Sequence, residues 1–269
     1  MQLNNFLDMN QPSLFKLEKL NSSKSLLRYP GGKSRAVKTI KKYIPKEIKV
    51  LFSPFLGGAS VELSCAADGI TVYGSDGFSP LIDFWQEALD NAEALAELVF
   101  KFYPMTRDNF YRLQKNYHNL QNRKERAAAF YTLNRCSFSG TTLSGGMSPK
   151  CPRFTTSAID RLRNFQNKNL HVYQSDYKEV LRSHSDKFLY LDPPYANGGK
   201  LYGRKGDMHN DFNHFDLAQL LNKRDGWILS YNDCQLVRDL YSKYPIYKPE
   251  WTYGMSSKKE SKEVLICAI

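Results

Sequence analysis

The sequence has no apolar run long enough to cross a membrane, because a spanning helix needs about 20 consecutive apolar residues. Its longest apolar stretches, among them Val264 to Ile269 and Trp227 to Leu229, are far shorter. The first residues lack the basic segment and apolar block that are typical of a signal peptide. We therefore expect a cytoplasmic protein that does not contact a membrane.

Cysteine is scarce as well. Five cysteines are scattered over 269 residues without a single CxxC pair, which argues against a disulfide framework and against a structural zinc site. His209 and His214 lie near acidic residues, but their spacing fits no strong metal-binding pattern. We interpret them as solvated loop histidines and predict no metal site.

Negative charge is in deficit. The chain has 27 Asp and Glu against 38 Lys and Arg, which gives a formal net charge of +11. This excess favours a polyanionic partner, although many basic proteins merely expose a solvated Lys-rich surface. With 42% hydrophobic residues, 16 Phe and 17 Tyr, the chain can still bury a sizeable core. Its length suits one large domain or two modest ones.

Short apolar runs alternate with helical patterns over much of the chain. The runs that indicate strands are Ile48 to Phe55, Ile70 to Ser75, His171 to Gln174, Phe188 to Leu191, Trp227 to Tyr231, Ile246 to Trp251 and Val264 to Ile269. Helical patterns cover Ser34 to Tyr43, Ala59 to Ala67, Leu81 to Leu98, Phe215 to Leu221 and Cys234 to Tyr244. This alternation predicts an α/β fold whose mostly parallel sheet is covered by helices on both faces.

A different pattern fills the middle of the chain, where the strand signal disappears. Arg107 to Arg126 reads as one polar helix, and Phe138 to Arg153, rich in Gly, Ser, Thr and Pro, reads as a β-hairpin or a mobile loop. We therefore predict an N-terminal arm over residues 1–24, a main domain formed by 25–89 and 169–269, and an inserted, mainly helical domain over 90–168.

The most specific feature is a four-residue motif directly after the apolar run 188–191. It consists of Asp192, Pro193, Pro194 and Tyr195. At the carboxyl end of a strand in an open α/β sheet, such residues face the crevice in which ligands bind. The alternative is a simple strand-ending turn, since proline cannot continue a central strand.

The motif suits the methylation of an exocyclic aromatic amine. The nitrogen of such an amine is a poor nucleophile because its lone pair is delocalised into the ring. The Asp192 carboxylate and the Pro193 carbonyl, held rigid by consecutive prolines, would accept its two hydrogens and push the nitrogen toward tetrahedral geometry. Tyr195 would offer a flat face for the base to stack on.

A second set of residues has the pattern of a nucleoside-binding site. Gly57 and Gly58 stand at a strand-to-helix turn, where missing side chains let a ligand approach the backbone. Asp76 ends the next expected strand, from which a carboxylate can hold two ribose hydroxyls. Taken singly, the glycines also fit a tight turn and the aspartate a helix cap. Gly31 to Ser34 is not a phosphate loop, because position 27 holds leucine where that loop needs glycine.

In these motifs and in their order, the chain resembles the Dam-like DNA N6-adenine methyltransferases with α-type arrangement, over most of its length. The matching stretches are Tyr29 to Lys33, Phe55 to Val61, Asp76, Leu133 to Arg135, Ser175 to Tyr177, Asp192 to Tyr195, Ile228 to Asn232 and Glu263 to Ile266. The resemblance implies a Rossmann-like SAM-dependent methyltransferase sheet and places a target-recognition domain in the insert. One departure is Ser53, where many members have an acidic residue before Pro-Phe.

The resemblance implies S-adenosyl-L-methionine (SAM) as the cofactor. The residues that it assigns to SAM binding are Tyr29, Lys33, Phe55, Gly57, Gly58, Asp76, Tyr177 and Asp192. Lys33 would lie near the methionine carboxylate, and Tyr177 beside the adenine of the cofactor. Tyr29 and Tyr177 also fit ordinary core aromatics. With serine at position 53, we expect Asp192 to balance more of the cofactor's positive charge.

The resemblance also implies double-stranded DNA as the substrate, with the target adenine flipped out because its N6 is paired inside the duplex. The residues that it assigns to DNA binding are Arg28, Asn134, Arg135, Phe138, Ser139 and Thr141. Phe138 would wedge into the base stack. The Arg and Leu that help Dam enzymes read GATC correspond to Leu143 and Thr141, so we do not predict GATC.

Further basic residues of the insert suit phosphate contacts, although a solvated helix face explains many such charges equally well. They are Arg112, Lys115, Arg123, Lys124, Arg126, Lys150, Arg153, Arg161 and Arg163. Lys200 to Lys205 is interpreted as a loop that closes near the target base or its phosphates.

The sequence thus predicts a site-specific DNA adenine N6-methyltransferase that transfers the methyl group by direct displacement, without a covalent enzyme intermediate. The same chemistry on RNA adenine, cytosine N4 or a protein glutamine amide is an alternative. A non-catalytic nucleic-acid-binding protein would be favoured only if Asp192 or Tyr195 were absent. We further expect a prokaryotic or phage protein near the nucleoid, a monomer or weak dimer, with a cognate restriction endonuclease as a candidate partner.

Overall fold

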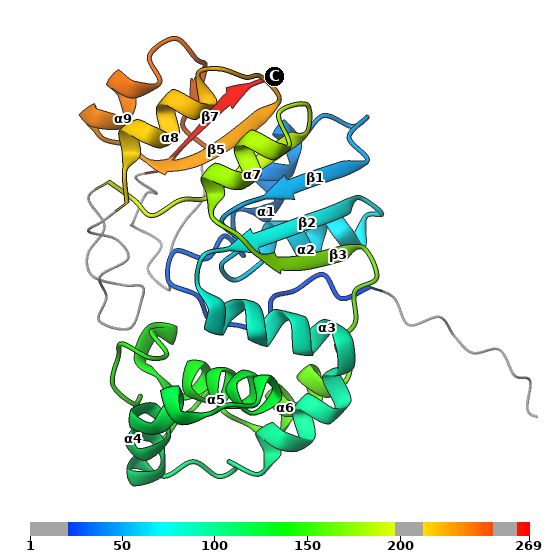
Figure 1. Cartoon of the computed structure of the whole chain (residues 1–269), viewed down its shortest axis with the longest axis vertical. Coiled ribbons are helices and arrows are strands. Elements are labelled where there is room, and N and C mark those ends of the chain that lie inside the picture. Colours follow the sequence, from blue (N-terminus) through cyan, green and yellow to red (C-terminus); the bar gives the residue numbers. More distant parts are fainter. Residues whose placement is uncertain (1–20, 197–211, 250–262) are drawn as a thin grey trace, which may run out of the picture.

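The computed structural model describes residues 21–196, 212–249 and 263–269. In Figure 1 a sheet flanked by helices forms the upper part of the molecule, and a group of helices forms the lower part. No helix among the described residues has the length and apolarity to cross a bilayer.

The sheet has seven strands in the order β3-β2-β1-β4-β5-β7-β6. The strands are β1 (Val50–Ser53), β2 (Thr71–Asp76), β3 (Leu170–Gln174), β4 (Phe188–Leu191), β5 (Trp227–Asn232), β6 (Ile246–Tyr247) and β7 (Glu263–Ala268). Strands β1 to β5 are parallel, whereas β7 is antiparallel to both β5 and β6. The mostly parallel α/β sheet expected from the apolar runs is confirmed. The strand order reverses between β1 and β4, since β2 and β3 are added on one side and β5 on the other, and this is the place where such sheets bind ligands.

Both faces of the sheet are covered, as predicted. Helices on these faces are α1 (Val37–Ile40) with the 3-10 turn η1 (Lys41–Tyr43), α2 (Ser60–Ala67), α3 (Ser79–Phe100), α7 (Tyr177–Ser183), α8 (His214–Leu221) and α9 (Gln235–Leu240). Neighbouring strand residues point to opposite faces. Tyr190 therefore joins one apolar core, while Leu189 and Leu191 join the other. Of these helices, α7 has no counterpart among the predicted ones.

The insert is helical, but the single helix expected in its first half is wrong. It contains α4 (Arg107–Asn116), η2 (Tyr117–Asn119), α5 (Arg123–Cys136), η3 (Phe138–Gly140) and α6 (Thr156–Arg163). The single helix expected over 107–126 breaks after η2, because Asn122 caps a new helix by accepting a hydrogen bond from the Lys124 N–H. Of the two alternatives for the Gly-rich segment, hairpin or loop, the structure shows the loop: the segment, all of which the structure describes, contains no strand and has one isolated bridge, between Ser137 and Met147.

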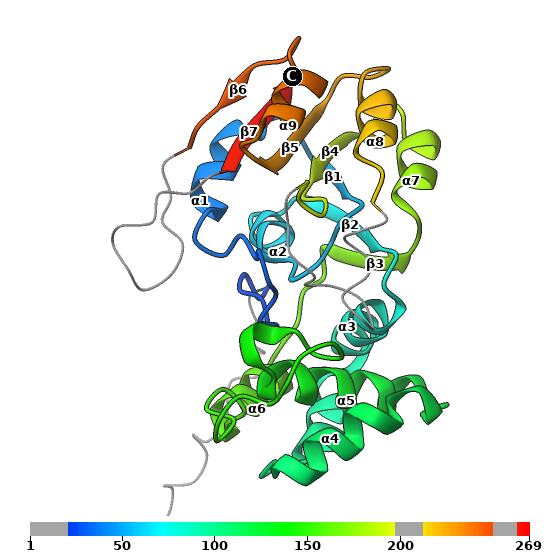
Figure 2. The same cartoon turned by 90° about the vertical axis from the view of Figure 1, so that its left-hand side faces the viewer.

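Helix α3 connects the sheet to the insert, and Figure 2 shows it running from the sheet toward α5. Its one non-helical residue is Asn91, at φ −155° and ψ 81°. The Phe84 ring stacks on Tyr131 of α5 at 5.5 Å between centroids, and one apolar core extends from Leu51 in the sheet to Leu162 in α6. The predicted division at residues 90 and 168 stays a prediction.

Candidate active site

A cavity of about 490 Å³ lies at the carboxyl ends of β1, β2 and β4 and reaches the loop after η3. Its volume is within the range of small-molecule sites, roughly 300–1,000 Å³. Residues from both predicted sets line it: Tyr29, Lys33, Phe55, Gly57, Gly58, Asp76, Thr141, Tyr177, Asp192, Pro193, Pro194 and Tyr195. The fold thus gathers the whole predicted cofactor set and the four-residue motif in one place.

Asp192 follows β4 directly and forms an ion pair with Lys33. The Lys33 Nζ lies 2.8 Å from each carboxylate oxygen of Asp192, and it also donates to the Gly31 carbonyl at 2.8 Å. Burial raises the pKa of Asp192 to about 6, and the Lys33 ammonium acts against this rise. Asp192 is therefore mostly ionised at neutral pH and is a hydrogen-bond acceptor there.

Glu263, at the start of β7, completes this network. The Tyr195 hydroxyl donates to the Glu263 Oε1 at 2.6 Å and to the Asp192 Oδ1 at 3.5 Å, and Lys33 Nζ lies 3.8 Å from the same Glu263 oxygen. The Ala196 N–H donates to the Asn232 side chain at 3.0 Å, which ties the end of the motif to β5. Glu263 begins one of the stretches that resemble the family, Glu263 to Ile266, but the sequence does not predict its contact with Tyr195.

Three aromatic rings gather at another part of the cavity. Ring centroids of Phe55 and Tyr177 are 5.2 Å apart, those of Tyr177 and Phe212 are 5.3 Å apart, and those of Phe55 and Phe212 are 5.7 Å apart. The Tyr177 hydroxyl is buried and has no hydrogen-bond partner among the described residues. Burial raises its pKa to about 12, so it is a neutral donor. Such an arrangement can enclose a flat heterocycle and offer it a hydrogen bond.

The glycine loop packs between Asp76 and Tyr29. The Gly57 N–H donates to one Asp76 carboxylate oxygen at 3.2 Å, and the Phe78 N–H donates to the other at 3.0 Å. Burial raises the pKa of Asp76 to about 6. A Cβ on Gly58 would lie 2.9 Å from the Tyr29 Cβ, so only glycine fits there. Asp76 is not the cap of α3, because the N-cap is Phe78 and makes no side-chain cap hydrogen bond; Asp76 instead holds two turn N–H groups and lines the cavity.

Glu62 of α2 is a cavity residue that the sequence reasoning missed. Its side chain is only 2% exposed, and its Oε1 accepts a hydrogen bond from the Ser53 hydroxyl at 2.6 Å. Burial raises the pKa of Glu62 to about 7. The sequence signal for Glu62 is a carboxylate within an otherwise apolar helical stretch. Its partner Ser53 stands where many family members have an acidic residue.

The predicted DNA-binding residues are Arg28 and residues at the end of α5, in η3 and directly after it. Their structural roles differ. Phe138 is 68% exposed at the start of η3, and Ser139 has a positive φ of 53°. Asn134 is completely buried: its side chain accepts from the Arg28 N–H at 2.9 Å and donates to the Arg28 carbonyl at 2.7 Å. Because no surface of Asn134 is exposed, its expected direct contact with DNA does not fit this position.

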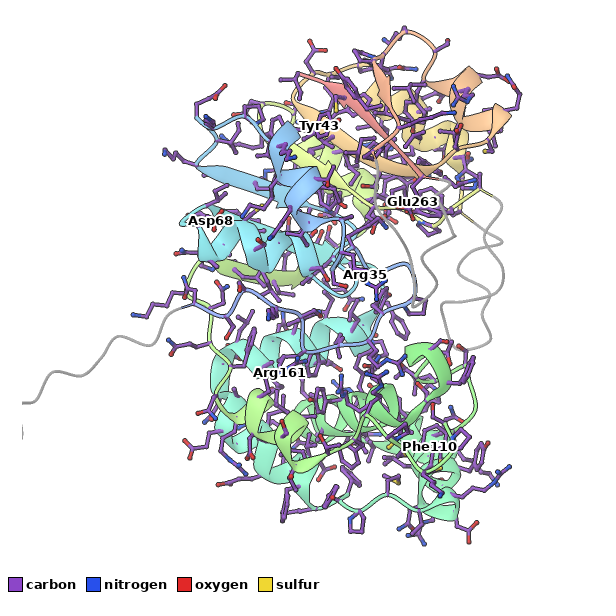
Figure 3. All side chains as sticks on the ribbon, turned by 180° about the vertical axis from the view of Figure 1, so that it is seen from behind. Arg35, Tyr43, Asp68, Phe110, Arg161 and Glu263 are labelled. Carbon is purple, nitrogen blue, oxygen red and sulfur yellow. The ribbon has the colours of Figure 1, made fainter. Side chains whose placement is uncertain are left out.

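Arg28 and three arginines of the insert influence one another. Burial, followed by the charges of Arg161, Arg28 and Arg153, lowers the pKa of Arg135 below its usual value. The Arg135 Nε donates to the Arg153 carbonyl at 2.9 Å, and Arg161 donates to the Ser25 carbonyl at 2.9 Å (Figure 3). Like charges held this close favour an anion such as phosphate.

Other basic residues of the insert are compensated by acids. Arg123 pairs with Glu87 at 2.5 Å, Arg126 with Asp83 at 2.7 Å, and Arg163 with Asp160 at 2.6 Å. The carboxylate partners of these three arginines come from α3 and α6 of the same chain, which favours the alternative of a solvated helix face, and their contact with phosphate stays a prediction.

His214 also differs from the expectation of a solvated loop histidine. It begins α8, is half-buried, and its Nδ1 shares a hydrogen bond with the Tyr231 hydroxyl. Burial lowers the pKa of His214. In the described part of the chain no three His, Cys, Asp or Glu side chains gather in a way that could hold a metal ion. His209 and the loop Lys200 to Lys205 lie outside the described residues.

Comparison with known proteins identifies the family of the chain. The family model of the D12 class N6 adenine-specific DNA methyltransferases matches residues 29–255, a span that includes the Asp192 to Tyr195 motif. The chain belongs to this family. The predicted family and enzyme class, adenine-specific DNA methyltransferase, are therefore confirmed, and membership implies that SAM is used.

Several curated relatives match nearly their whole length. The Type II methyltransferase M1.LlaDCHI of Lactococcus lactis subsp. cremoris is 23% identical, over 87% of this chain and 90% of the relative. The Type II methyltransferase M.CviBI of Paramecium bursaria Chlorella virus NC1A is 21% identical, over 90% and 96%. The DNA adenine methylase of Salmonella typhimurium is 25% identical, over 91% and 95%.

Proposed function

We propose that this enzyme methylates N6 of a specific adenine in double-stranded DNA, with SAM bound in the cavity between the sheet and η3. The observation that carries the proposal is the convergence, in one cavity, of the Asp192 motif with a second set of residues suited to a nucleoside. The Asp192 motif is suited to a target amine. The second set consists of Phe55, Asp76, Tyr177 and Phe212 and is suited to the nucleoside part of SAM.

The chain's own residues fit SAM. The rings of Phe55, Tyr177 and Phe212 would hold its adenine, and the Tyr177 hydroxyl, which has no partner among the described residues, would find an acceptor there. Asp76 would still offer a lone pair to ribose hydroxyls, because a carboxylate has about four acceptor positions and the backbone N–H groups near it are those of Gly57, Phe78 and Gly77. When bound, SAM supplies a methyl group activated by its positively charged sulfur.

Asp192 and Pro193 would prepare the target nitrogen. The ionised Asp192 carboxylate and the Pro193 carbonyl accept the two N6 hydrogens, which localises the lone pair on nitrogen. The new N–C bond forms as the S–C bond breaks, and the surplus N6 proton passes to Asp192, whose pKa of about 6 suits this role. Glu263 and Lys33 hold Tyr195 and Asp192 in place, so that the base stacks against a fixed ring.

The insert over 90–168 would recognise the DNA. We assign phosphate contacts to Arg28, Arg135 and Arg153, and a wedge into the base stack to the exposed Phe138. Ser139 and Thr141 would touch base edges. Asn134 would act by fixing Arg28, and sites other than GATC are expected because Leu143 and Thr141 occupy the positions that read GATC in Dam enzymes.

The test is methylation of plasmid DNA in cells that express the enzyme, followed by single-molecule sequencing to map N6-methyladenine and its flanking bases. We expect one modified motif, absent with the Asp192→Ala variant. Methyl groups found only in RNA or protein would refute the proposal. A partner endonuclease, the monomeric or weakly dimeric state and the place in the cell stay predictions.

A further inference from the structure

The cavity contains a carboxylate for which the mechanism above has no use. Strand β1 ends at Ser53, the position at which many family members have an acid. Glu62 lies nine residues later in the first turn of α2, and the Ser53 hydroxyl donates to its carboxylate. The acid is therefore displaced from the end of the strand to the adjacent helix, while the hydrogen bond holds the two positions together.

The charges near Glu62 do not balance. Asp192 and Glu263 both share Lys33, at 2.8 Å and 3.8 Å, so Glu62 is a third carboxylate near one ammonium group. Asp192 acts to raise the pKa of Glu62, and Lys33 acts weakly to lower it. The charge of Glu62 also contributes to the raised pKa of Cys65, three residues later in α2, where Asp68 acts in the same direction and Lys41 against it. Within β4, it contributes to the raised pKa of Tyr190.

We propose that Glu62 replaces the acid missing at position 53 and balances the positive charge of SAM at its sulfonium and methionine end. This inference rests on the proposed function, because it takes SAM as the ligand of the cavity. SAM has two positive groups and one carboxylate and so a net charge of +1, and Glu62 would add negative charge to the group in which Asp192 and Glu263 share Lys33. Glu62 lines the cavity and is nearly free of solvent, where a charge acts strongly.

The inference predicts proton release when SAM binds. A carboxyl with a pKa of about 7 is about half protonated at pH 7, and a nearby cation lowers its pKa. Binding should therefore release about half a proton from Glu62 at pH 7, and SAM affinity should rise with pH through this range. Asp76 and Asp192, with pKa values of about 6, are mostly ionised already and contribute little.

The experiment is isothermal titration of the full chain with SAM at pH 7, in two buffers with different ionisation enthalpies. Glu62→Gln keeps the acceptor for the Ser53 hydroxyl and removes only the charge. We expect it to bind SAM about tenfold more weakly, the effect of one pKa unit, and to lose the half-proton release. Glu87→Gln, a buried acid of α3 paired with Arg123 outside the cavity, is the matched control and should retain both.

A second variant separates charge from shape. Ser53→Asp combined with Glu62→Gln returns the acid to the end of the strand and should restore SAM affinity to within about threefold of the wild type. The inference is overturned if Glu62→Gln binds SAM within twofold of the wild type or releases as many protons. A wild-type chain that does not bind SAM would instead overturn the proposed function itself.

Discussion

The ion pair between Lys33 and Asp192 makes a quantitative prediction about the pH dependence of methyl transfer. Transfer needs the ionised Asp192 carboxylate, so the rate should fall as pH falls through the pKa of this group. Burial has already raised that pKa to about 6, with Lys33 opposing the rise. Because the positive charge of bound SAM lowers the pKa of a nearby carboxyl, the wild-type enzyme should lose half of its maximal rate at or below about pH 6.

Lys33→Met removes the ammonium that lies 2.8 Å from both carboxylate oxygens. A neighbouring cation lowers a carboxyl pKa by about 1–3 units, so its loss should raise the pKa of Asp192 to between about 7 and 9. At pH 7 the ionised fraction then falls from about nine-tenths to between about one-half and one-hundredth. The rate at pH 7 should fall in proportion and recover as the pH rises.

The assay is the single-turnover rate of tritium transfer from saturating SAM to DNA, measured from pH 5.5 to 9.5. Saturation separates the effect on Asp192 from any loss of cofactor affinity. Lys178→Met is the control, because Lys178 also lines the cavity but pairs with Asp216. The pH at which its rate falls on the acid side should stay near that of the wild type. An acid limb still near pH 6 in Lys33→Met would refute the reasoning.

Four further predictions follow from single contacts. Asp192→Ala should lower methyl transfer at least about 1,000-fold while gel-shift affinity for DNA stays within about twofold; equal labelling by the variant would exclude Asp192 from the chemistry. Phe138→Ala should leave the melting temperature unchanged because the ring is exposed, yet weaken DNA binding about tenfold by fluorescence anisotropy. Gly140→Ala should destabilise the fold by about 2 kcal/mol or more in urea unfolding, because its Cβ would lie 2.1 Å from the Arg28 carbonyl. Tyr177→Phe removes a hydroxyl that has no partner among the described residues, so thermal stability should not fall, whereas calorimetric SAM affinity should drop by about threefold to tenfold.

The sheet could be predicted because its signal is local and strong. Each buried strand is a short apolar run, and the predicted run Phe188 to Leu191 is reproduced as β4 without a shift. The seven-residue helix α7 escaped because so short a segment shows too little of the helical period. The break between α4 and α5 was not predicted because the polar sequence around Asn122 fits both a continuous helix and a helix cap.

The site was predictable where a residue type has a recognisable motif, and unpredictable where chemistry arises from contacts between distant residues. Asp192 can be recognised from a motif of four consecutive residues. Its partnership with Lys33 joins positions 159 apart, and the bond between Tyr195 and Glu263 joins positions 68 apart. Such pairs are set by the order of the strands, which brings β7 beside β5, and no local pattern reports that order.

The structure also connects DNA recognition with the cofactor site through two consecutive residues. Arg28 is fixed to the insert by the buried Asn134 side chain and by its close approach to Gly140. The next residue, Tyr29, packs on the glycine loop that lines the cavity. Any movement of η3 against the sheet must therefore displace the Tyr29 ring or break the hydrogen bonds to Asn134. Arg28, which lies near Arg135 and Arg153, and Tyr29, which lines the cavity together with Asp76 and Asp192, are therefore adjacent residues that link a group of arginines to an acidic cavity.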